Sequence, residues 1–213
     1  MSTPHETVTL RPAQADDCAA LADLLVQLYH AEMPGVLRGT PEGQRAFVSA
    51  LLSVGGLGGW TGRSMVYDSD GALVGTAGMY LPGEPQIISV PPGIFLLAWR
   101  SLGPANALVM ITSMARAVFS GGSGLPPSTA YIHSVVVDQR ARGRGVGQAL
   151  LAELERSAAE RGARAVQLRV IVGNEPARRL YLRQGYRVVG RTPRWIAPLT
   201  FPTETMHKTL APE

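Results

Sequence analysis

The sequence contains little that could cross-link the chain or anchor it in a membrane. It has one cysteine, Cys18, so no disulfide can form within the chain. The best candidate for a membrane segment, Ile94 to Trp99, is far shorter than the roughly 20 apolar residues that a spanning helix needs. The polar start MSTPHETVTL lacks the basic and apolar parts of a secretory signal. We therefore expect a cytoplasmic protein that has no membrane partner.

Charge is also scarce, and its distribution disfavours some partners. Charged residues make up 17 % of the sequence, whereas hydrophobic residues make up 46 %, enough for a full core. Basic residues, almost all arginine, concentrate between Arg140 and Arg194. Because no aromatic residues alternate with them in a basic platform, and no zinc-finger or other metal-ligand spacing is present, we expect neither nucleic acid nor a metal. A small ligand with several phosphate groups fits better.

The order of predicted elements indicates one α/β domain with a mixed sheet. An early hairpin predicts antiparallel strands, whereas a later strand, helix and strand predict a parallel crossover. We expect a single domain over residues 1–213, with an insertion at 82–129 between the hairpin and the crossover. Strands are predicted at 8–10, 64–67, 73–80, 131–137, 166–172, 186–189 and 205–210, and helices at about 18–30, 41–52, 105–119, 146–161 and 174–185.

The stretch from Tyr131 to Gly147 combines a strand, an arginine-glycine loop and the start of a helix. Alternation along the strand predicts two faces, with Tyr131, His133, Val135 and Val137 on one and Ile132, Ser134 and Val136 on the other. Glycines in the loop permit a tight turn that exposes backbone N–H groups, and a helix N-terminus attracts anions. The stretch therefore predicts a phosphate-binding site.

Two common phosphate motifs do not fit this loop. A Walker A loop needs GxxxxGK followed by Ser or Thr, and neither the lysine nor the hydroxyl residue is present. The dinucleotide pattern GxGxxG fails because Gly143-Arg144-Gly145 is followed by Val146-Gly147, and no acidic residue ends the next strand. A nucleotide triphosphatase and a Rossmann domain are therefore disfavoured.

The loop resembles the pyrophosphate loop of the GCN5-related N-acetyltransferases (GNAT), whose pattern is Q/R-x-x-G-x-G/A. The segment Arg142-Gly143-Arg144-Gly145-Val146-Gly147 matches this pattern. A second family signature follows the next strand, in the residues Asn174, Ala177, Leu180-Tyr181 and Gly185-Tyr186. Loop, helix, strand and second signature occur together at the family's spacing, which makes the resemblance specific.

The resemblance implies acetyl-CoA, or another acyl-CoA, as the donor, lying between splayed strands at 131–137 and 166–172. Backbone groups near Val135 and Val137 would pair with the pantetheine arm, and N–H groups of the loop would hold the pyrophosphate. Asn174 would hydrogen-bond the pantetheine, and Tyr181 would stand near the thioester sulfur. The donor-binding residues are thus Val135, Val137, Arg142, Gly143, Arg144, Gly145, Val146, Gly147, Gln148, Asn174 and Tyr181.

Two residues are candidates for proton transfer. Tyr181 can act as the general acid, since a phenol is protonated at neutral pH, although it could instead only pack on the inner face of its helix. His133, with a reference pKa of about 6.5, can accept the proton of an amine directly or through water, although it could instead be a core residue. The surrounding AYIHSVVV is similar to a strand of arylalkylamine acetyltransferases, with Tyr131 where a second histidine would stand.

A glutamate serves as the base in many members of the family, but this sequence offers none at the expected place. The outward positions of the strand after the loop hold Gln167 and Arg169. Glu32 and Glu84 lie outside both matched segments, so we did not expect either to be the base.

These residues and the resemblance predict an N-acetyltransferase that moves an acetyl group directly from acetyl-CoA to an amine acceptor, as a monomer or homodimer. The acceptor would be a small molecule or a protein N-terminus, in a pocket built by the regions 33–60, 81–129 and 191–203. Trp60, Trp99 and Trp195 could line this pocket or pack elsewhere. The alternative is a non-catalytic acyl-CoA-binding or regulatory module, which would have the same donor site as the enzyme.

Overall fold

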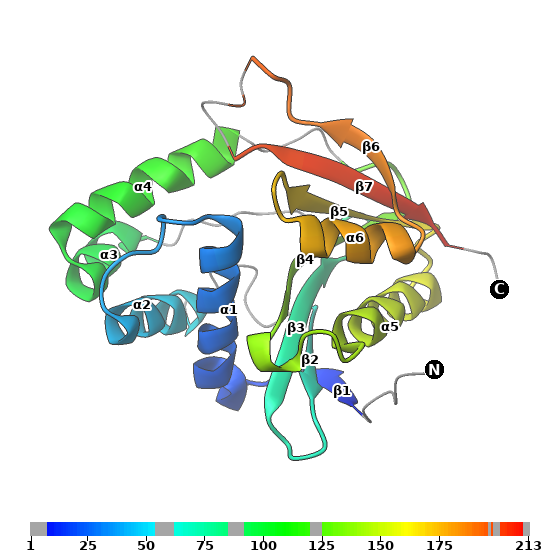
Figure 1. Ribbon diagram of the computed structural model, residues 1–213, viewed down its shortest axis with the longest axis horizontal. Coiled ribbons are helices and arrows are strands. Elements are labelled where there is room, and N and C mark those ends of the chain that lie inside the picture. The colour runs from blue at the N-terminus through cyan, green and yellow to red at the C-terminus, as the bar shows by residue number, and fades with distance from the viewer. Residues whose placement is uncertain are drawn as a thin grey trace.

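The computed structural model describes residues 8–53, 62–84, 92–119, 125–195, 197 and 201–210 (Figure 1). The strands are β1 (Thr9–Pro12), β2 (Arg63–Tyr67), β3 (Leu73–Tyr80), β4 (Thr129–Val137), β5 (Ala165–Ile171), β6 (Arg187–Arg191) and β7 (Thr203–Thr209). The helices are α1 (Cys18–Glu32), α2 (Pro41–Ser53), α3 (Ile94–Leu102), α4 (Pro104–Phe119), α5 (Val146–Glu160) and α6 (Glu175–Arg183), with short 3-10 turns η1 (Ala15–Asp17) and η3 (Gln139–Ala141). Trp60 lies outside the described residues.

The strands form one seven-stranded sheet in the order β1-β2-β3-β4-β5-β7-β6. Paired strands are antiparallel except β4 and β5, which are parallel. Helix α5 makes the crossover between these two strands, as a parallel connection requires. The predicted α/β fold, with a mostly antiparallel sheet and one parallel pair, is confirmed.

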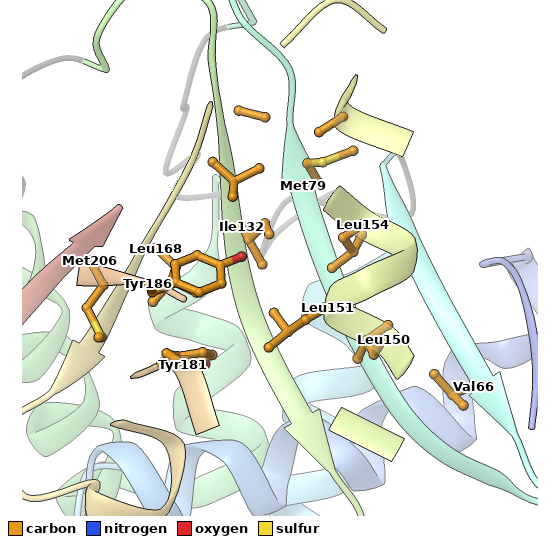
Figure 2. Packing of buried hydrophobic residues seen from close by; sticks show 14 of the residues in the cluster. Val66, Met79, Ile132, Leu150, Leu151, Leu154, Leu168, Tyr181, Tyr186 and Met206 are labelled. Carbon is orange, nitrogen blue, oxygen red and sulfur yellow. The ribbon is translucent and has the colours of Figure 1, made fainter. Parts of the chain in front are cut away.

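Helices cover both faces of the sheet, and each face has its own hydrophobic core. Figure 1 shows α1 and α5 on opposite sides of β3 and β4. One core joins α5, α6 and the sheet through residues that include Met79, Ile132, Leu150, Leu154 and Tyr181 (Figure 2). The other core joins α1, α2, α3 and α4 through residues that include Leu21, Leu25, Phe47, Leu102 and Met110. The sheet thus holds two helical layers in fixed positions on its two sides.

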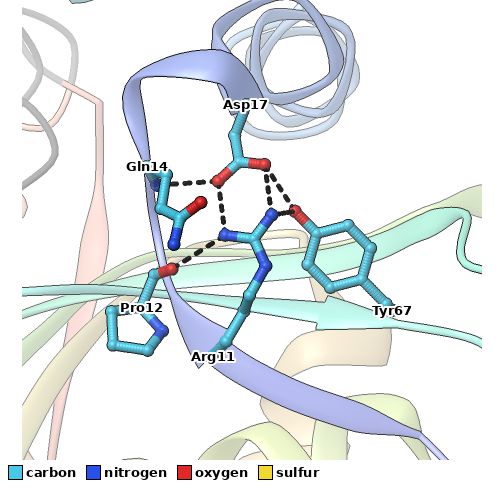
Figure 3. A network of polar contacts seen from close by, with 5 residues as sticks. All are labelled: Arg11, Pro12, Gln14, Asp17 and Tyr67. Atoms are coloured by element: carbon cyan, nitrogen blue, oxygen red, sulfur yellow. Dashed lines mark hydrogen bonds and ion pairs between the residues drawn. The ribbon is translucent and has the colours of Figure 1, made fainter.

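An ion-pair network fixes the chain where β1 leads into α1 (Figure 3). Arg11 donates hydrogen bonds of 2.6 and 2.8 Å to the Asp17 carboxylate, and the Tyr67 hydroxyl donates another of 2.6 Å. The backbone N–H of Gln14 donates to the same carboxylate at 2.7 Å. Arg11 is the main cause that lowers the pKa of Asp17 to about 2. The network ties the first strand of the sheet to the start of α1.

A bulge at Ser134 interrupts β4. Ser134 has a φ of 51°, and the pairing register with β3 shifts by one residue between His133 and Val136. An extra residue in one strand reverses the alternation of side chains beyond it. His133 therefore shares a face with Val136, while Val137 packs against the core on the α5 side. The prediction that His133 and Val137 share a face is wrong for this reason.

Within the described residues of the region predicted as an insertion, the structure has two helices, of which the sequence predicted only α4. The apolar patch IFLLAW forms α3, where Ala98 is buried and Phe95, Leu96 and Trp99 are exposed. That this region is an insertion into a smaller domain stays a prediction. Across the part of the chain that the structure describes, no helix is both long and apolar enough to cross a membrane.

Candidate active site

The site begins where β4 and β5 separate. The two strands pair at three positions, which join Thr129–Tyr131 to Ala165–Gln167. Beyond Gln167, β5 pairs with β7 as far as Ile171, while β4 continues along β3. The bulge in β4 bends that strand at the same point. The parallel strands therefore splay apart, and two cavities are lined by the residues beyond the split.

The larger cavity, called here the loop cavity, has a volume of about 820 Å³ and is lined by the end of β4, the glycine loop and α6. All the predicted donor-binding residues line it: Val135, Val137, Arg142, Gly143, Arg144, Gly145, Val146, Gly147, Gln148, Asn174 and Tyr181. Arg179 and Arg183 of α6 add further positive charge. The structure thus brings together every residue of this group, and their binding roles stay predictions.

The backbone of the glycine loop has the geometry of an anion-binding site. Gly143 and Gly145 have φ values of 80° and 84°, in the left-handed region that favours glycine. Gly145 is the N-cap of α5, so the N–H groups in the first turn of that helix have no partner within the helix. Arg142 donates from Nε to the carbonyl oxygen of Val137 at 3.2 Å, which holds the loop against the end of β4. Phosphate is the ligand that this arrangement favours.

The entry to the loop is clamped by Asp138 and by Gln27 of α1. The Asp138 carboxylate accepts hydrogen bonds from the backbone and side chain of Arg140, at 2.8 and 3.0 Å, and from Gln27 Nε2 at 3.0 Å. Gln27 Oε1 in turn accepts from the backbone N–H of Gln139 at 3.2 Å. Arg140 is the main cause that lowers the pKa of Asp138 to about 2. Helix α1 and the start of the loop are therefore held together.

Helix α6 is fixed at its start and along its length. Asn174 is its N-cap, as the sequence predicted, and its side chain accepts a hydrogen bond from a backbone N–H of the first turn at 3.3 Å. Arg178 Nε donates to Glu204 of β7 at 2.7 Å, and Glu204 also pairs with Arg191 of β6 at 2.8 Å. These contacts hold the helix that carries Tyr181 against β6 and β7.

The smaller cavity, called here the aromatic cavity, has a volume of about 300 Å³. It is lined by Glu32, Met33, Tyr131, Ile132, His133, Ser134, Val135, Leu168, Arg169, Ile171, Tyr181, Phe201 and Thr203. Val135 and Tyr181 line both cavities, so these two residues mark the place where the cavities meet. The loop cavity and the aromatic cavity are therefore adjacent at these two residues.

Tyr181 combines packing with access to both cavities. Its relative exposure is 4 %, and its ring centroid lies 5.8 Å from that of Tyr186 in the core (Figure 2). Burial raises the pKa of Tyr181, and the nearby Glu32 and Tyr131 raise it further. The phenol is therefore protonated at neutral pH. The two interpretations of Tyr181, as a packing residue and as an acid, are compatible in this position.

His133 lines the aromatic cavity in surroundings that oppose a positive charge. Its ring stacks on Tyr80 with centroids 4.6 Å apart, and it lies over Gly78, where an added Cβ would overlap the ring. Burial lowers the pKa of His133 to about 3, and the Arg63 guanidinium contributes to that decrease. The imidazole is therefore neutral across the neutral pH range. An ionisation near pH 6 to 7 in a rate profile would have to come from another group.

Glu32, the last residue of α1, is the site residue that sequence reasoning did not favour. It lies outside both matched segments, and only the fold brings it to the aromatic cavity. Burial raises the pKa of Glu32 to about 7. Its charge raises the pKa values of Tyr131 and Tyr181, which places these three side chains near one another. Glu84, in contrast, accepts a hydrogen bond from the Leu81 N–H at 2.8 Å and lines neither cavity.

The regions expected to build the acceptor pocket contribute unequally. Met33 and Phe201 come from two of those regions and line the aromatic cavity, whereas no described residue of 81–129 does. Trp99 and Trp195 line neither cavity and have relative exposures of 47 % and 81 %. Of the tryptophans that could line the acceptor pocket, these two therefore lie elsewhere.

Comparison with known proteins identifies the family and the fold. The model of the Acetyltransferase (GNAT) family matches residues 25–186, which is most of the chain. A curated relative, the uncharacterized protein ML0378 of Mycobacterium leprae (strain TN), is 41 % identical over 70 residues, a match that covers 33 % of this chain and 19 % of that protein. This chain therefore aligns with only a small part of that relative's length.

Two solved structures show the same fold at low sequence identity. A GCN5-related N-acetyltransferase from Kribbella flavida has a TM-score of 0.55 at 23 % identity, with 95 % of this chain and 98 % of that chain covered. The yncA protein of Salmonella typhimurium, solved with its cofactor acetyl-CoA, has a TM-score of 0.53 at 16 % identity, with 96 % and 95 % covered. Together, the sheet order, the glycine loop and the match over residues 25–186 show that this chain belongs to the GNAT acetyltransferase family.

Proposed function

We propose that this protein transfers the acetyl group of acetyl-CoA directly to an amine. The observation that carries the proposal is the meeting of the loop cavity and the aromatic cavity at Tyr181 and Val135. A donor in one cavity and an acceptor in the other would place their reacting atoms beside the same phenol. Direct transfer needs this contact between the two substrates.

The loop cavity supports acetyl-CoA as the donor. Left-handed Gly143 and Gly145 and the N-terminus of α5 would bind the pyrophosphate, and Arg142 and Arg144 line the same cavity. The splayed end of β4, at Val135 to Val137, lines the cavity and would offer backbone groups to the amide-like pantetheine arm. The presence of acetyl-CoA in the related Salmonella typhimurium fold agrees with this assignment. When bound, acetyl-CoA supplies the acetyl group as a reactive thioester.

Tyr181 would act as the general acid. The amine nitrogen forms a bond to the carbonyl carbon, the carbon–sulfur bond breaks, and the departing sulfur takes a proton from the phenol. Because its burial keeps the phenol protonated, Tyr181 still carries this proton when the carbon–sulfur bond breaks. The nitrogen gives up a proton to solvent as the amide forms, and Tyr181 takes a proton back from solvent. Removal of the hydroxyl would slow this step while leaving the backbone groups of the donor site in place.

His133 would contact the acceptor in its neutral form. With its pKa lowered to about 3, the imidazole is a weak proton acceptor near neutral pH. It can still accept a hydrogen bond from an amine, and its Nδ1 lies 3.1 Å from Ser134 Oγ. We therefore propose that His133 orients the acceptor through this hydrogen bond. A proton transfer from the amine to His133 would have to follow the same hydrogen bond.

The assay for this proposal measures free thiol release from acetyl-CoA in the presence of a panel of primary amines, with product mass as the second readout. We expect thiol release that depends on the amine, together with a product heavier by one acetyl group. The alternative of a regulatory module predicts tight acetyl-CoA binding with no thiol release above the protein-free rate for any amine. That result would overturn the proposed activity while leaving the donor site intact.

A further inference from the structure

The aromatic cavity contains one carboxylate among the described residues that line it. This carboxylate belongs to Glu32, at the end of α1, and it is half-buried. Among the described residues, no cation forms an ion pair with it. A carboxylate withdrawn from water without a counter-charge is unfavourable, so a cationic ligand in this cavity would be stabilised by it.

Resting on the proposed transfer to an amine, we propose that Glu32 binds the ammonium group of the acceptor and accepts its proton, and that the acceptor is a compact aromatic monoamine. Both parts of the proposal, the role of Glu32 and the class of the acceptor, are inferred from the residues that line the aromatic cavity. The position of Glu32, the chemistry of the walls and the remaining charges each support one part of this proposal.

The position of Glu32 places the amine beside the reacting atoms. Its charge acts on Tyr181, which lines both cavities, and on Tyr131, which lines the aromatic cavity. An ammonium group bound by Glu32 would therefore lie next to the place where the cavities meet. After the proton moves to a carboxylate oxygen, the nitrogen lone pair is free to attack the carbonyl carbon. Glu32 then releases this proton to solvent, and the nitrogen loses its second proton to solvent as the amide forms. The separate proton of Tyr181 goes to the departing sulfur.

The walls of the cavity favour an aromatic body on the acceptor. Tyr131, His133, Tyr181 and Phe201 contribute four aromatic rings, and the apolar Leu168 lies among them. Aromatic faces pack well against another ring and also attract a cation. A volume of about 300 Å³ lies at the lower end of the usual range for ligand pockets, so the acceptor must be compact.

The other charges around Glu32 favour a single amine without an acidic group. The titratable groups that face it from its own helix and from β4, β5 and α6 are Tyr29, Tyr131, His133, Arg169 and Tyr181. The tyrosines have pKa values raised by burial and stay neutral, and His133 is neutral as well. The guanidinium of Arg169 already interacts within the chain. Arg169 would repel a second ammonium group on the acceptor. A carboxylate on the acceptor would have to compete with the interaction that Arg169 already makes.

Protonation of Glu32 should control acceptor binding near neutral pH. Since burial raises the pKa of Glu32 to about 7, the carboxylate is mostly ionised at pH 8 and mostly protonated at pH 6. An alkyl amine stays protonated over that interval, and the surrounding tyrosines and His133 do not titrate in it. Ammonium binding should therefore weaken as the pH falls from 8 to 6, and Glu32 is the group responsible.

The test measures 2-phenylethylamine binding to the complex of the protein with CoA by calorimetry, because that complex cannot react. We expect Glu32→Gln to weaken binding about 10- to 100-fold at pH 8 and to abolish its pH dependence. Glu32→Asp, which keeps the charge, should retain the pH dependence with intermediate affinity. Glu42→Gln, at an exposed position in the first turn of α2, is the matched control and should bind as the unmodified protein does. Unchanged binding and pH dependence in Glu32→Gln would overturn the role of Glu32.

A set of related ligands tests the acceptor class. Phenylalanine adds a carboxylate to 2-phenylethylamine, 2-cyclohexylethylamine removes the aromatic ring, and a tripeptide with N-terminal phenylalanine adds a backbone. We expect each to bind at least about fivefold more weakly than 2-phenylethylamine. Tighter binding of phenylalanine or the tripeptide would overturn the monoamine class. Binding of 2-phenylethylamine without acetyl transfer would contradict the proposed function alone, whereas transfer that is insensitive to Glu32→Gln would contradict this inference alone.

Discussion

The loop cavity and the aromatic cavity meet at Tyr181 but are built in different ways. The glycine-loop wall of the loop cavity depends on backbone conformation within one continuous segment, from the end of β4 to the start of α5, while α6 and Leu28 and Ala31 of α1 close the cavity. The aromatic cavity depends on side chains that come from α1, β4, β5, α6 and the start of β7. Consecutive residues can therefore specify the first cavity, whereas the second exists only after the whole sheet has assembled.

This difference separates the part of the site that is general from the part that is selective. Backbone N–H groups recognise phosphate whatever side chains surround them, so a short glycine pattern is enough for the donor. Side chains that line the aromatic cavity can change one at a time without disturbing the loop. Substitutions should accordingly affect one substrate or the other, and those at Tyr181 and Glu32 should in addition affect the reaction that joins the two substrates.

The largest effect is expected for Tyr181→Phe, which removes the hydroxyl at the meeting point and keeps the packed ring. We expect kcat to fall about 100-fold, because a general acid contributes at least that much to many enzymes. The Kd for acetyl-CoA should change by less than about threefold, since no donor-binding backbone group is lost. Steady-state kinetics and calorimetry measure the two quantities. An unchanged kcat would remove Tyr181 from the chemistry and leave it as a packing residue.

A smaller effect, confined to the acceptor, is expected for Gly78→Ala. The new methyl group would overlap the His133 ring, so the ring must move within the aromatic cavity. We expect the acceptor KM to rise about tenfold and the free energy of unfolding to fall by about 1 to 3 kcal/mol. Gly190→Ala in β6 is the control, because a Cβ there would lie 3.7 Å from Thr205 in ordinary contact. An equal rise in the KM for acetyl-CoA would show that the cavities are not independent.

The donor side is tested by Gly143→Ala, with Gly162→Ala as a matched control. Both glycines are left-handed, with φ values of 80° and 83°, and an added Cβ would meet no heavy atom within 4 Å at either position. Both variants should lose about 1 to 2 kcal/mol of stability from backbone strain. Only Gly143 lines the loop cavity, so only its variant should bind acetyl-CoA about fivefold more weakly by calorimetry. Equal affinities in the two variants would contradict a backbone role for the loop.

The smallest kinetic effect is expected from substitution of Asp17 or Asp138. The two carboxylates have similarly lowered pKa values but lie in different parts of the protein. Hydrogen bonds from the side chains of Arg11 and Arg140 lower the pKa values of Asp17 and Asp138 to about 2, below the usual Asp value of about 3.9. A lowered pKa stabilises the fold above pH 4, and this contribution is lost as the pH falls towards 2. Asp17→Asn and Asp138→Asn should each cost about 2 kcal/mol at pH 7, with the difference from the unmodified protein shrinking between pH 4 and 2.

Substitutions of the two aspartates should differ in their effect on the KM for acetyl-CoA. Asp138 clamps the entry to the glycine loop, so Asp138→Asn should also raise the KM for acetyl-CoA about threefold. Asp17 lines neither cavity, and its variant should leave both KM values unchanged. Denaturant titrations across pH and steady-state kinetics provide the two measurements. A rise in the acetyl-CoA KM for Asp17→Asn would show that the β1 corner affects the loop.

The family resemblance selected a set of residues that line the loop cavity. The sequence by itself determined the mixed α/β sheet, the glycine loop and the Asn174 N-cap. These features depend on residues close together in the chain, where periodicity, helix capping and loop patterns act locally. The crossover between β4 and β5 also followed from local order, because a strand, helix and strand can return to one sheet only as a parallel unit.

Only the tertiary structure decided the aromatic cavity, where we propose that the acceptor binds. The bulge at Ser134 reverses the alternation of β4, and no simple periodicity predicts one extra residue. The fold brings Glu32 from the end of α1 into the same cavity as His133. It also raises the pKa of Glu32 and lowers that of His133, because burial disfavours the charged form of each. Burial depends on all the elements packed around a side chain, and a linear pattern does not contain that information.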